Sequence, residues 1–446
     1  MKYPVSENIR QFASIFRDNG HKLFIVGGAV RDYLLGKPNS DYDFCTDATP
    51  EQVISMFRKV IPTGIKHGTV TVLFKGSSFE VTTFRTEGAY SDRRHPDNVT
   101  FVTDLSEDLS RRDFTVNAFA ADCLDGSIID LFDGMKDLRS KTIRAIGVPR
   151  ERFEEDALRL MRLARFCSKL GFEPDEETLK AATELSLSIS NVSQERIYDE
   201  LSKILASEKP TVGLRLLEQM GVLEVILPEL TECRKVEQTK VGATDVLEHI
   251  YNTVDAAAHL NYSYNVRLAA LLHDIAKPQT MVINVYGIMR FHGHDIKSAQ
   301  MARIVMRRLK CSNQLTDTVC NLIENHMVKY RDNWTDGAVK RFIKRVGRDN
   351  INELFELQWC DQIASEGKSK VEEYDPFIRR IRELENQPMS VKDLAINGDD
   401  LSDAGIPKSK VMGEILDALL EMVIDYPSLN DKETLINQAI LLYKNK

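Results

Sequence analysis

The sequence predicts an α+β protein, in which a small mixed sheet with helices at the N-terminal end is followed by an all-helical remainder. Strand-length apolar runs bounded by turn residues are concentrated in the N-terminal third. From about residue 150 the apolar positions recur with helical spacing, and no comparable strand pattern returns apart from a hairpin over residues 280–291. With 446 residues the chain is too long for one hydrophobic core, so we expect roughly two to four domains.

The predicted head begins with an alternation of helix and strand. Residues 6–18 have helical spacing of apolar side chains and stop at Gly20, and residues 23–26 form an apolar run typical of a buried strand. A short helix that ends at Gly36 follows. The next strand carries the acidic motif of residues 41–46.

Two further features complete the predicted sheet. Thr49 and Pro50 supply a capping residue and a first-turn proline for another helix. Residues 70–74 and 79–84, joined by the turn sequence KGSS, predict a hairpin.

An aspartate pair in the sequence DYDFCT predicts a metal-binding group. Strand side chains alternate with a period of two, so Asp41 and Asp43 would point to the same side and share a cation. Mg²⁺ prefers carboxylate oxygens, and two such ions about 4 Å apart can clamp the attacking and leaving oxygens of a phosphoryl transfer. The alternative is a solvated pair of loop charges. Glu80, on the second hairpin strand, is either a third carboxylate of this group or a surface side chain.

A glycine pair precedes the acids in the sequence FIVGGAVRDYLLG. Because they lack side chains, Gly27 and Gly28 let backbone amides approach a triphosphate. A helix beginning near Ala29 would point its positive end at the same anion. Together with Arg31 and the acidic strand, the pair indicates nucleotidyl transfer.

The sequence SRRDFTVNA places Arg111, Arg112 and Asp113 just before an apolar turn. Arginines in such a position can cradle phosphate or ribose. The alternative is an ion pair with Glu107 or Asp108.

The segment EEDALRLMRLARF predicts a helix with an apolar stripe on one face and Glu155, Asp156, Arg159 and Arg162 on another. Asp156 and Arg159, three residues apart, would form a helical ion pair or a recognition site for a base. Cytosine and adenine both present an amino donor beside a ring-nitrogen acceptor, whereas uracil and guanine present the reverse order. An aspartate and an arginine together would therefore accept C and A and reject U and G.

Composition limits the classes of function. A net charge of -8 argues mildly against a protein that coats nucleic acid indiscriminately. A local basic groove stays open, because basic stretches occur at Lys340-Arg341, at Lys344-Arg345 and at Arg303 with Arg307-Arg308. Seven cysteines without a CxxC pair indicate reduced thiols and a cytosolic location, and they argue against a cysteine zinc site. No apolar stretch approaches about 18 residues and the N-terminus lacks a signal sequence, so no membrane partner is expected.

The motifs occur in the order GGAVRDYLLG with DYDFCT, HGTVTV, EVTTFRTEGAYSDRRHP, RRDFTVNAFA, EEDALRLMRLARF and SQERIYDEL. Over residues 20–205 they resemble the class II tRNA nucleotidyltransferases, that is, the CCA-adding enzymes and the related bacterial poly(A) polymerases. The resemblance implies a polymerase-beta-like nucleotidyltransferase head and a helical neck, body and tail. It also implies a cytoplasmic, Mg²⁺-dependent enzyme that adds C, C and A to tRNA 3′ ends from CTP and ATP without a nucleic-acid template.

By the same resemblance, Asp41 and Asp43 are the catalytic metal ligands, and Asp156 and Arg159 serve as the protein template for the base. The positions that match the family's nucleotide site are Gly27, Gly28, Arg31, Arg111, Arg112, Asp113, Asp156, Arg159 and Arg162.

Relatives with this head differ in activity, because some add only CC, some add only the final A and some make poly(A) tails. The charged stretch of residues 86–99 resembles the flexible loop associated with the switch from C to A addition. It favours full CCA addition or A addition. A poly(A) polymerase or A-only enzyme, and a metal-dependent phosphohydrolase whose head merely binds nucleotide, are the alternatives.

Six of the nine histidines fall between His249 and His326. Together with two aspartates they resemble the HD phosphohydrolase superfamily, in which histidines and aspartates on packed helices bind one or two divalent metals. The matching positions are His249, His273, Asp274 and Asp361 for a primary metal, with His294 and His326 for a second. Imidazole and carboxylate suit Mn, Ni, Co, Fe or Zn, and such a metal would activate water for phosphoester hydrolysis. The alternative is a degenerate HD fold kept for packing.

Length alone predicts roughly two to four domains, whereas the motifs and the resemblances divide the chain more finely into five, and the oligomeric state stays open. They are a nucleotidyltransferase head (1–145), a neck (146–205), a body (206–240), an HD domain (241–370) and a helical tail (371–446).

Overall fold

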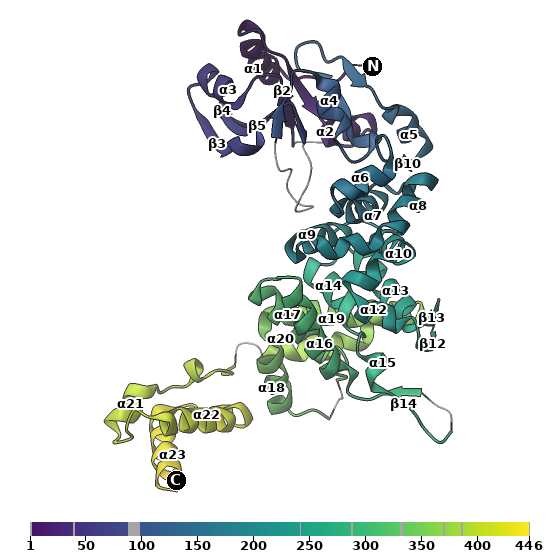
Figure 1. Cartoon of the computed structure of the whole chain (residues 1–446). Helices are drawn as coiled ribbons and strands as arrows, with labels where there is room; N and C mark the ends of the chain where they lie inside the picture. Colours follow the sequence, from purple (N-terminus) through teal and green to yellow (C-terminus); the bar gives the residue numbers. More distant parts are fainter. Residues whose placement is uncertain are drawn as a thin grey trace. The chain divides into compact units, whose positions relative to one another are not determined.

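The chain divides into two compact units, Met1–Thr231 and Glu232–Lys446, and each is described by itself (Figure 1). The five finer domain boundaries stay predictions. The structure is a computed structural model that describes residues 2–38, 41–87, 99–240, 242–286, 289–330, 333–368, 371–384 and 387–445.

The first unit opens with a seven-stranded mixed sheet in the order β3-β4-β5-β2-β1-β8-β9. β2 and β5 run parallel and the other neighbours are antiparallel. The predicted hairpin is confirmed, since β4 and β5 are joined by a tight turn at Lys75 and Gly76. The strands are β1 (Leu23–Val26), β2 (Asp43–Thr46), β3 (Val60–Gly64), β4 (Thr69–Phe74), β5 (Ser77–Thr83), β8 (Phe119–Asp122) and β9 (Ile128–Asp130).

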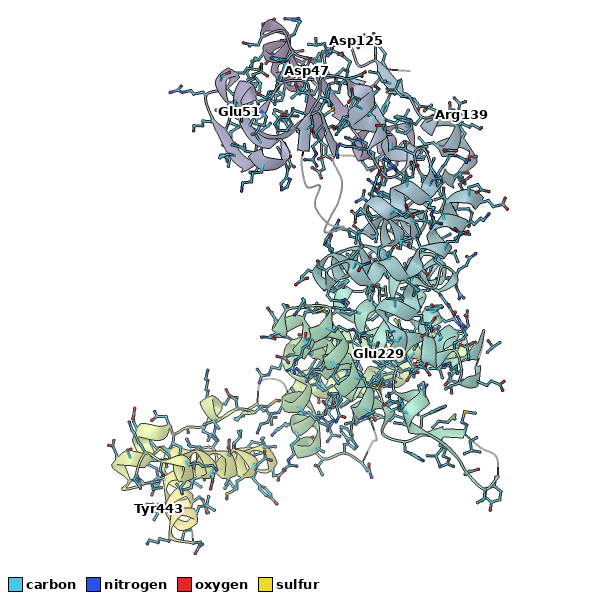
Figure 2. All side chains as sticks on the ribbon, in the orientation of Figure 1. Asp47, Glu51, Asp125, Arg139, Glu229 and Tyr443 are labelled. Atoms are coloured by element: carbon cyan, nitrogen blue, oxygen red, sulfur yellow. The ribbon has the colours of Figure 1, made fainter. Side chains whose placement is uncertain are left out.

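One face of this sheet is buried beneath an aromatic cluster centred on helix α1 (Glu7–Asp18). The ring of Phe12, which is fully buried, lies 4.6 Å from the ring of Phe79 and 5.9 Å from that of Phe44. Burying one such side chain contributes about 1.5–3 kcal/mol, so this face is fixed as the core side. As predicted, helix α3 (Pro50–Met56) has Thr49 as its capping residue and a proline in its first turn. Gln52 completes a capping box that was not predicted, and the first-turn Glu51 faces solvent (Figure 2).

The carboxylates stand on the opposite face of the sheet. Asp43 pairs in register with Glu80, and Glu80 with Thr71. Residues in register on neighbouring strands point to the same side, so these three side chains form a row. Phe44 and Phe79, one position away along the strands, point into the core instead.

Strand β2 begins at Asp43, so the prediction that Asp41 also lies on the strand is wrong. The neighbouring strand β1 ends at Val26, because Gly27 turns the chain with a φ of +68°. The β1–β2 ladder therefore does not reach Asp41, which lies in the segment that leads into β2. The β1–β2 pair is closed at its other end by Asp47, which accepts a 2.9 Å hydrogen bond from the backbone N–H of Lys22 (Figure 2).

Several short elements complete the head. The predicted loop of residues 86–99 is described only at its ends, in β6 and β7, because residues 88–98 lie outside the described part of the chain. The elements are α2 (Gly28–Leu34), β6 (Arg85–Glu87), β7 (Val99–Phe101), α4 (Leu105–Ser110), α5 (Gly134–Ser140) and β10 (Thr142–Ile143), which pairs with β11 (Glu173–Pro174).

The rest of the first unit is helical, as predicted, but the segment EEDALRLMRLARF is not one helix. It breaks between α6 (Pro149–Glu155) and α7 (Leu158–Leu170). Asp156 is extended at the break, and its carboxylate accepts a 3.0 Å hydrogen bond from the backbone N–H of Leu158. An aspartate that satisfies a first-turn N–H favours a new helix start over continuation. The following helices are α8 (Glu176–Glu184), α9 (Gln194–Leu205), α10 (Pro210–Gln219) and α11 (Val222–Ile226).

The second unit is a helical bundle with two hairpins. The hairpin predicted over residues 280–291 is confirmed as β14 (Met281–Ile283) and β15 (Met289–Phe291), whereas the pair β12 (Glu237–Lys240) and β13 (Ala243–Asp245) was not predicted. The helices are α13 (Val246–His259), α14 (Tyr264–Leu272), α15 (Lys277–Thr280), α16 (His294–Arg308), α17 (Asn313–Asn325), α18 (Asp336–Val346), α19 (Ile351–Glu366), α20 (Asp375–Leu384), α21 (Gly398–Asp403), α22 (Lys410–Asp425) and α23 (Lys432–Lys444).

The basic stretch on α18 faces the acidic side of α22. Arg341 donates to Glu421 at 2.9 Å and to Asp425 at 2.7 Å, and Lys344 lies 3.4 Å from Glu421. The positive charges of Arg341 and Lys344 are therefore balanced by acids of α22, and the basic groove that the sequence left open stays a prediction. Within the described residues, no helix is both long enough and apolar enough to cross a bilayer.

Candidate active site and metal centre

A cavity of ≈ 1060 Å³ opens in the first unit beside the carboxylate row and α7. Every residue predicted for the nucleotide site borders it, together with Asp41 and Asp43, whereas Glu80 does not. Basic side chains outnumber acidic ones, so the cavity suits an anion. Its basic residues are Arg31, Arg85, Arg111, Arg112, Arg159, Arg162, Arg165, Lys169, Arg196 and Lys203, and its acidic residues are Asp41, Asp43, Asp113 and Asp156.

The glycine pair lets guanidinium groups approach the backbone. A Cβ on Gly27 would lie 2.9 Å from Nη1 of Arg112, and one on Gly28 would lie 3.3 Å from Nη2 of Arg31. Gly27 also has a positive φ, which other residues rarely adopt. The positive φ therefore favours glycine at position 27, and a side chain at either position would displace the neighbouring guanidinium group.

The two aspartates place negative charge at the rim of the cavity. Partial burial and the charge of Asp41 raise the pKa of Asp43, while the Arg112 guanidinium opposes the shift. This direction indicates a carboxylate that a nearby cation would stabilise. Carboxylate oxygens suit a divalent ion such as Mg²⁺. Among the described residues, sets of three donors close enough for one metal occur only in the second unit, so Glu80 does not close a three-ligand group with the aspartates.

Arg111 and Arg112 are held from behind by Asp108, whose side chain is buried. Arg111 lies 2.8 Å from one carboxylate oxygen of Asp108 and Arg112 lies 3.5 Å from the other. Of the two acids that the sequence offered as ion-pair partners for these arginines, Asp108 is the one that pairs with them. It is compatible with ligand binding, because both arginines also border the cavity.

Asp113 is buried and accepts hydrogen bonds from three neighbouring groups. Its carboxylate accepts hydrogen bonds from Arg162 at 2.7 Å, from Asn117 at 2.9 Å and from the backbone N–H of Phe114 at 2.8 Å. Burial raises the pKa of Asp113, but the Arg162 charge and these bonds outweigh it, so the net shift is downward. Asn117 in turn accepts from Arg31. Asp113 thus fixes two cavity arginines through direct and relayed contacts.

Phe166 of α7 makes cation–π contacts with three of the guanidinium groups that border the cavity. The ring centroid of Phe166 lies 4.5 Å from Arg165 and 5.5 Å from both Arg31 and Arg162. Stacking on a buried ring holds a guanidinium in place without neutralising its charge. Sequence reasoning missed this residue, although it follows Arg162 by four positions, a spacing that puts both side chains on one face of a helix.

The predicted template residues border the same cavity, but they do not pair with each other. Asp156 accepts from Arg196 at 2.8 Å, and Arg159 donates to Glu155 at 2.6 Å. Arg159 also donates to the backbone carbonyl of Arg111 at 2.8 Å. The helical ion pair considered from the sequence is therefore wrong, because the helix break rotates Asp156 away from the face of Arg159. Arg196, forty residues away in the chain, was missed.

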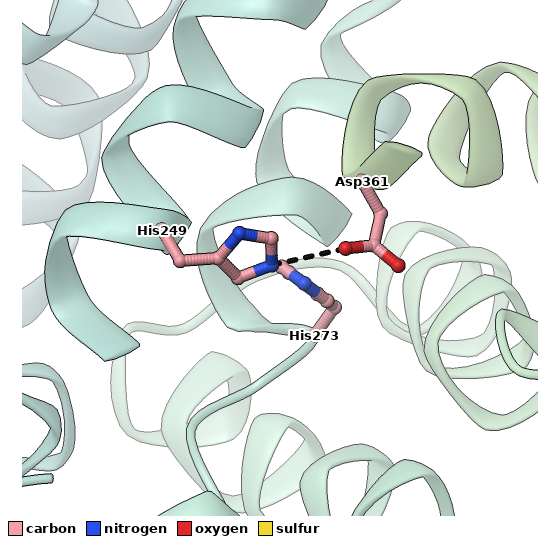
Figure 3. A group of neighbouring side chains, drawn as sticks. All are labelled: His249, His273 and Asp361. Atoms are coloured by element: carbon pink, nitrogen blue, oxygen red, sulfur yellow. Dashed lines mark ion pairs between the residues drawn. The ribbon is translucent and has the colours of Figure 1, made fainter. Parts of the chain in front are cut away.

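The second unit gathers the predicted HD residues at one buried point. His249 of α13, His273 after α14 and Asp361 of α19 converge, with Nε2 of His249 3.0 Å from an Asp361 oxygen (Figure 3). Asp274 lies 3.2 Å from Nε2 of His273. His294 and His326 complete the cluster, the former 3.3 Å from Asp274 and the latter grouped with His273 and Asp274.

The imidazoles are oriented as metal ligands are. Nδ1 of His273, His294 and His326 lies 2.8, 2.7 and 2.6 Å from a backbone carbonyl oxygen, so Nε2 of each ring faces the cluster. Nε2 of His326 is buried and makes no hydrogen bond within the described residues. Burial and the His273 charge lower the pKa of His326 to about 4, so its ring is neutral at pH 7, the form that binds metal.

Asp274 is the acidic centre of the cluster. It is buried, and Lys277 lies 2.5 Å from one of its oxygens. Burial opposes its charge, but His273 and Lys277 hold the pKa of Asp274 well below its usual range. A buried carboxylate surrounded by inward Nε2 atoms fits a divalent transition metal.

Three family models match successive parts of the chain. One described as Poly A polymerase head domain matches residues 23–144. One described as Probable RNA and SrmB-binding site of polymerase A matches residues 171–234. One described as tRNA nucleotidyltransferase domain 2 putative matches residues 294–439.

Similar whole proteins are known. The CCA-adding enzyme of Ligilactobacillus salivarius is 35% identical over 433 residues, which cover 96% of this chain and 95% of that protein. The CCA-adding enzyme of Levilactobacillus brevis is 32% identical over 98% of this chain and 96% of that protein. Among solved structures, the Bacillus stearothermophilus CCA-adding enzyme in complex with CTP matches with a TM-score of 0.74 and 29% identity, covering 98% of each chain.

The role of Asp113 in holding arginines predicts an effect on nucleotide binding. Asp113→Asn removes the charge that fixes Arg162, so we expect CTP affinity, measured by calorimetry, to fall about tenfold, the value of a charged hydrogen bond. The control is Asp18→Asn, at an exposed position. Unchanged CTP affinity in Asp113→Asn would show that the network does not position the cavity arginines.

Proposed function

The chain belongs to the CCA-adding enzyme family, and from that premise we propose that it adds C, C and A to tRNA 3′ ends, using CTP and ATP and releasing pyrophosphate. One observation supports the assignment of this reaction to the cavity of the first unit. The glycine turn, the aspartate pair, the basic wall and the two template residues border a single space in the first unit. A nucleoside triphosphate needs those features together.

The proposed reaction is a phosphoryl displacement. The 3′ oxygen of the tRNA bonds to the α-phosphorus, the bond from that phosphorus to its bridging oxygen breaks, and pyrophosphate leaves while the hydroxyl proton passes to solvent. Asp41 and Asp43 would hold divalent metal, which when bound supplies electrostatic stabilisation of the reacting oxygens. Arg31, Arg111 and Arg112 would bind the triphosphate, since they border the cavity beside the glycine turn.

Base selection is assigned to the start of α7. Asp156 would accept from the amino group of C or A, with Arg196 and the Leu158 N–H fixing its carboxylate. Arg159 would donate to the ring nitrogen. It faces Glu155 and two carbonyls here, so the proposal requires its guanidinium to turn toward the base on binding.

Full CCA addition is favoured over a poly(A) or A-only activity, because the whole-length relatives are CCA-adding enzymes. Incorporation on tRNA that ends at the discriminator base separates these activities. We expect successive use of CTP and then ATP. Failure to use CTP on this substrate would instead favour an A-only enzyme or poly(A) polymerase.

Replacing the carboxylate pair tests the proposed chemistry. We expect Asp41→Ala or Asp43→Ala to reduce transfer at least about 10³-fold, because the metal ligands are lost, while tRNA affinity by filter binding stays within about twofold. The control is Glu51→Ala, at an exposed acid of α3. A variant that keeps its principal activity would favour a phosphohydrolase whose head only binds nucleotide.

Replacing Asp156 tests the template. Asp156→Ala removes the acceptor for the amino group, so discrimination against UTP, measured as the ratio of kcat/KM values for CTP and UTP, should fall about 10- to 100-fold. Glu154→Ala, at an exposed acid of α6, serves as the control. An Asp156→Ala enzyme that still strictly refuses UTP would rule out the template role.

A second activity is proposed for the second unit, on the strength of its buried cluster. His249, His273, Asp274 and Asp361 would hold one divalent metal, with His294 and His326 available for another. The metal would be Mn, Ni, Co, Fe or Zn, and it would supply an activated water for phosphoester hydrolysis. The substrate class proposed is a phosphorylated nucleotide or RNA end, such as a 2′,3′-cyclic phosphate or a 2′-phosphate.

This activity is tested with metal-loaded protein on 2′,3′-cyclic nucleotides. We expect hydrolysis, and we expect a His273→Ala, Asp274→Ala double variant to lose both hydrolysis and stoichiometric Ni²⁺ or Zn²⁺ binding by calorimetry. His259→Ala, at an exposed histidine of α13, should keep both. Circular dichroism verifies folding of each variant. Hydrolysis that survives in the double variant would refute the assignment.

A further inference from the structure

One face of α7 borders the nucleotide cavity along the length of the helix. Arg159, Arg162 and Phe166 follow one another at spacings of three and four, so their side chains share this face. Arg159, with Asp156 just before the helix, is proposed to read the base, and Phe166 lies about 10 Å further along the axis. The helix therefore connects the base-reading end of the cavity to the ring of Phe166.

Arg31 reaches this ring from the other side of the cavity. It is a buried residue of α2, and a Cβ on Gly28 would lie 3.3 Å from its Nη2, so its guanidinium group stands against the glycine turn proposed for the triphosphate. The same guanidinium group lies 5.5 Å from the ring centroid of Phe166. Arg31 thus contacts both the glycine turn and α7.

The ring attracts three groups of like charge, and each of them also has an acidic partner. The ion pairs are Arg31 with Asp32 at 2.8 Å, Arg162 with Asp113 at 2.7 Å and Arg165 with Glu200 at 3.1 Å. The electron-rich faces of the ring add an attraction that leaves each positive charge available to an anion. A change in the ring therefore acts on all three arginines together.

We propose that Phe166 is a positioning residue that couples base selection to the placement of the triphosphate. A base accepted by Asp156 and Arg159 fixes α7 against the nucleotide, and the ring of Phe166 then holds Arg31 where it meets the phosphates. A base that is refused leaves α7, and with it Arg31, out of this arrangement. Both ends of the nucleotide thus bias one shared element, which is the physical requirement for coupling. The coupling rests on the proposed nucleotidyl transfer and on the proposed template residues.

The test changes the ring and leaves the groups that touch the base as they are. Phe166→Leu removes the ring, whereas phenylalanines with one, two or three fluorine atoms at position 166 keep the ring but weaken its attraction for cations. CTP affinity is measured by calorimetry, and kcat/KM is measured for CTP and for UTP. The matched control carries the same fluorinated residues at Phe12, a fully buried ring that packs against other aromatic rings. Circular dichroism verifies folding of each protein.

We expect CTP affinity to fall about three- to tenfold in Phe166→Leu, the value of a cation–π contact, and to fall stepwise with each fluorine atom at position 166. The ratio of kcat/KM for CTP to that for UTP should fall by a similar factor, because a correct base no longer places Arg31. The proteins fluorinated at position 12 should match the wild type within about twofold.

Two results would overturn the coupling. One is an equal loss of kcat/KM for CTP and UTP in Phe166→Leu, because the ring would then serve triphosphate binding alone. The other is wild-type CTP affinity in the protein with three fluorine atoms at position 166, because the attraction of the ring for cations would then have no effect. A wild type that does not extend tRNA with CTP would instead reject the proposed function itself.

Discussion

The head depends on where the strand pair β1–β2 ends. Gly27 turns the chain after Val26, so the ladder stops at Asp43 and leaves Asp41 beyond it. Two carboxylates are thereby placed at the start of the central strand β2, with the opposite face of the sheet fixed in the core by Phe44. Like charges held this near each other favour a bound cation. The same turn admits Arg112 against the backbone.

The basic wall of the nucleotide cavity depends on acids placed behind it. Asp108 holds Arg111 and Arg112, and Asp113 holds Arg162 and reaches Arg31 through Asn117. These contacts fix the guanidinium groups before a ligand arrives, and fixed charges stabilise a developing anion without reorganisation. The second unit has the opposite arrangement of charge. There a buried acid, Asp274, lies at the centre and is surrounded by a lysine and by histidines that could bind metal.

Local patterns made much of the head predictable. The glycine pair, the spacing of Asp41 and Asp43 and the hairpin before Glu80 are short-range features, and the structure gathers them as neighbours. The break at Asp156 could not be seen, since the apolar stripe runs through it and one side-chain hydrogen bond to Leu158 ends the helix. Asn117 was missed because its partner Arg31 is distant in the chain. Phe166 was missed although its partners Arg162 and Arg165 are local, because a phenylalanine in a helix is more often read as a core residue than as an arginine contact. The histidine cluster was reached only through family resemblance, since its members lie on separate helices.

The most direct measurement is a crystal structure of the protein with CTP and a tRNA that lacks its terminal CCA. We expect the triphosphate against Gly27 and Gly28 and the cytosine edge at Asp156. A CTP molecule bound away from the aspartate pair would contradict the assignment of the whole site.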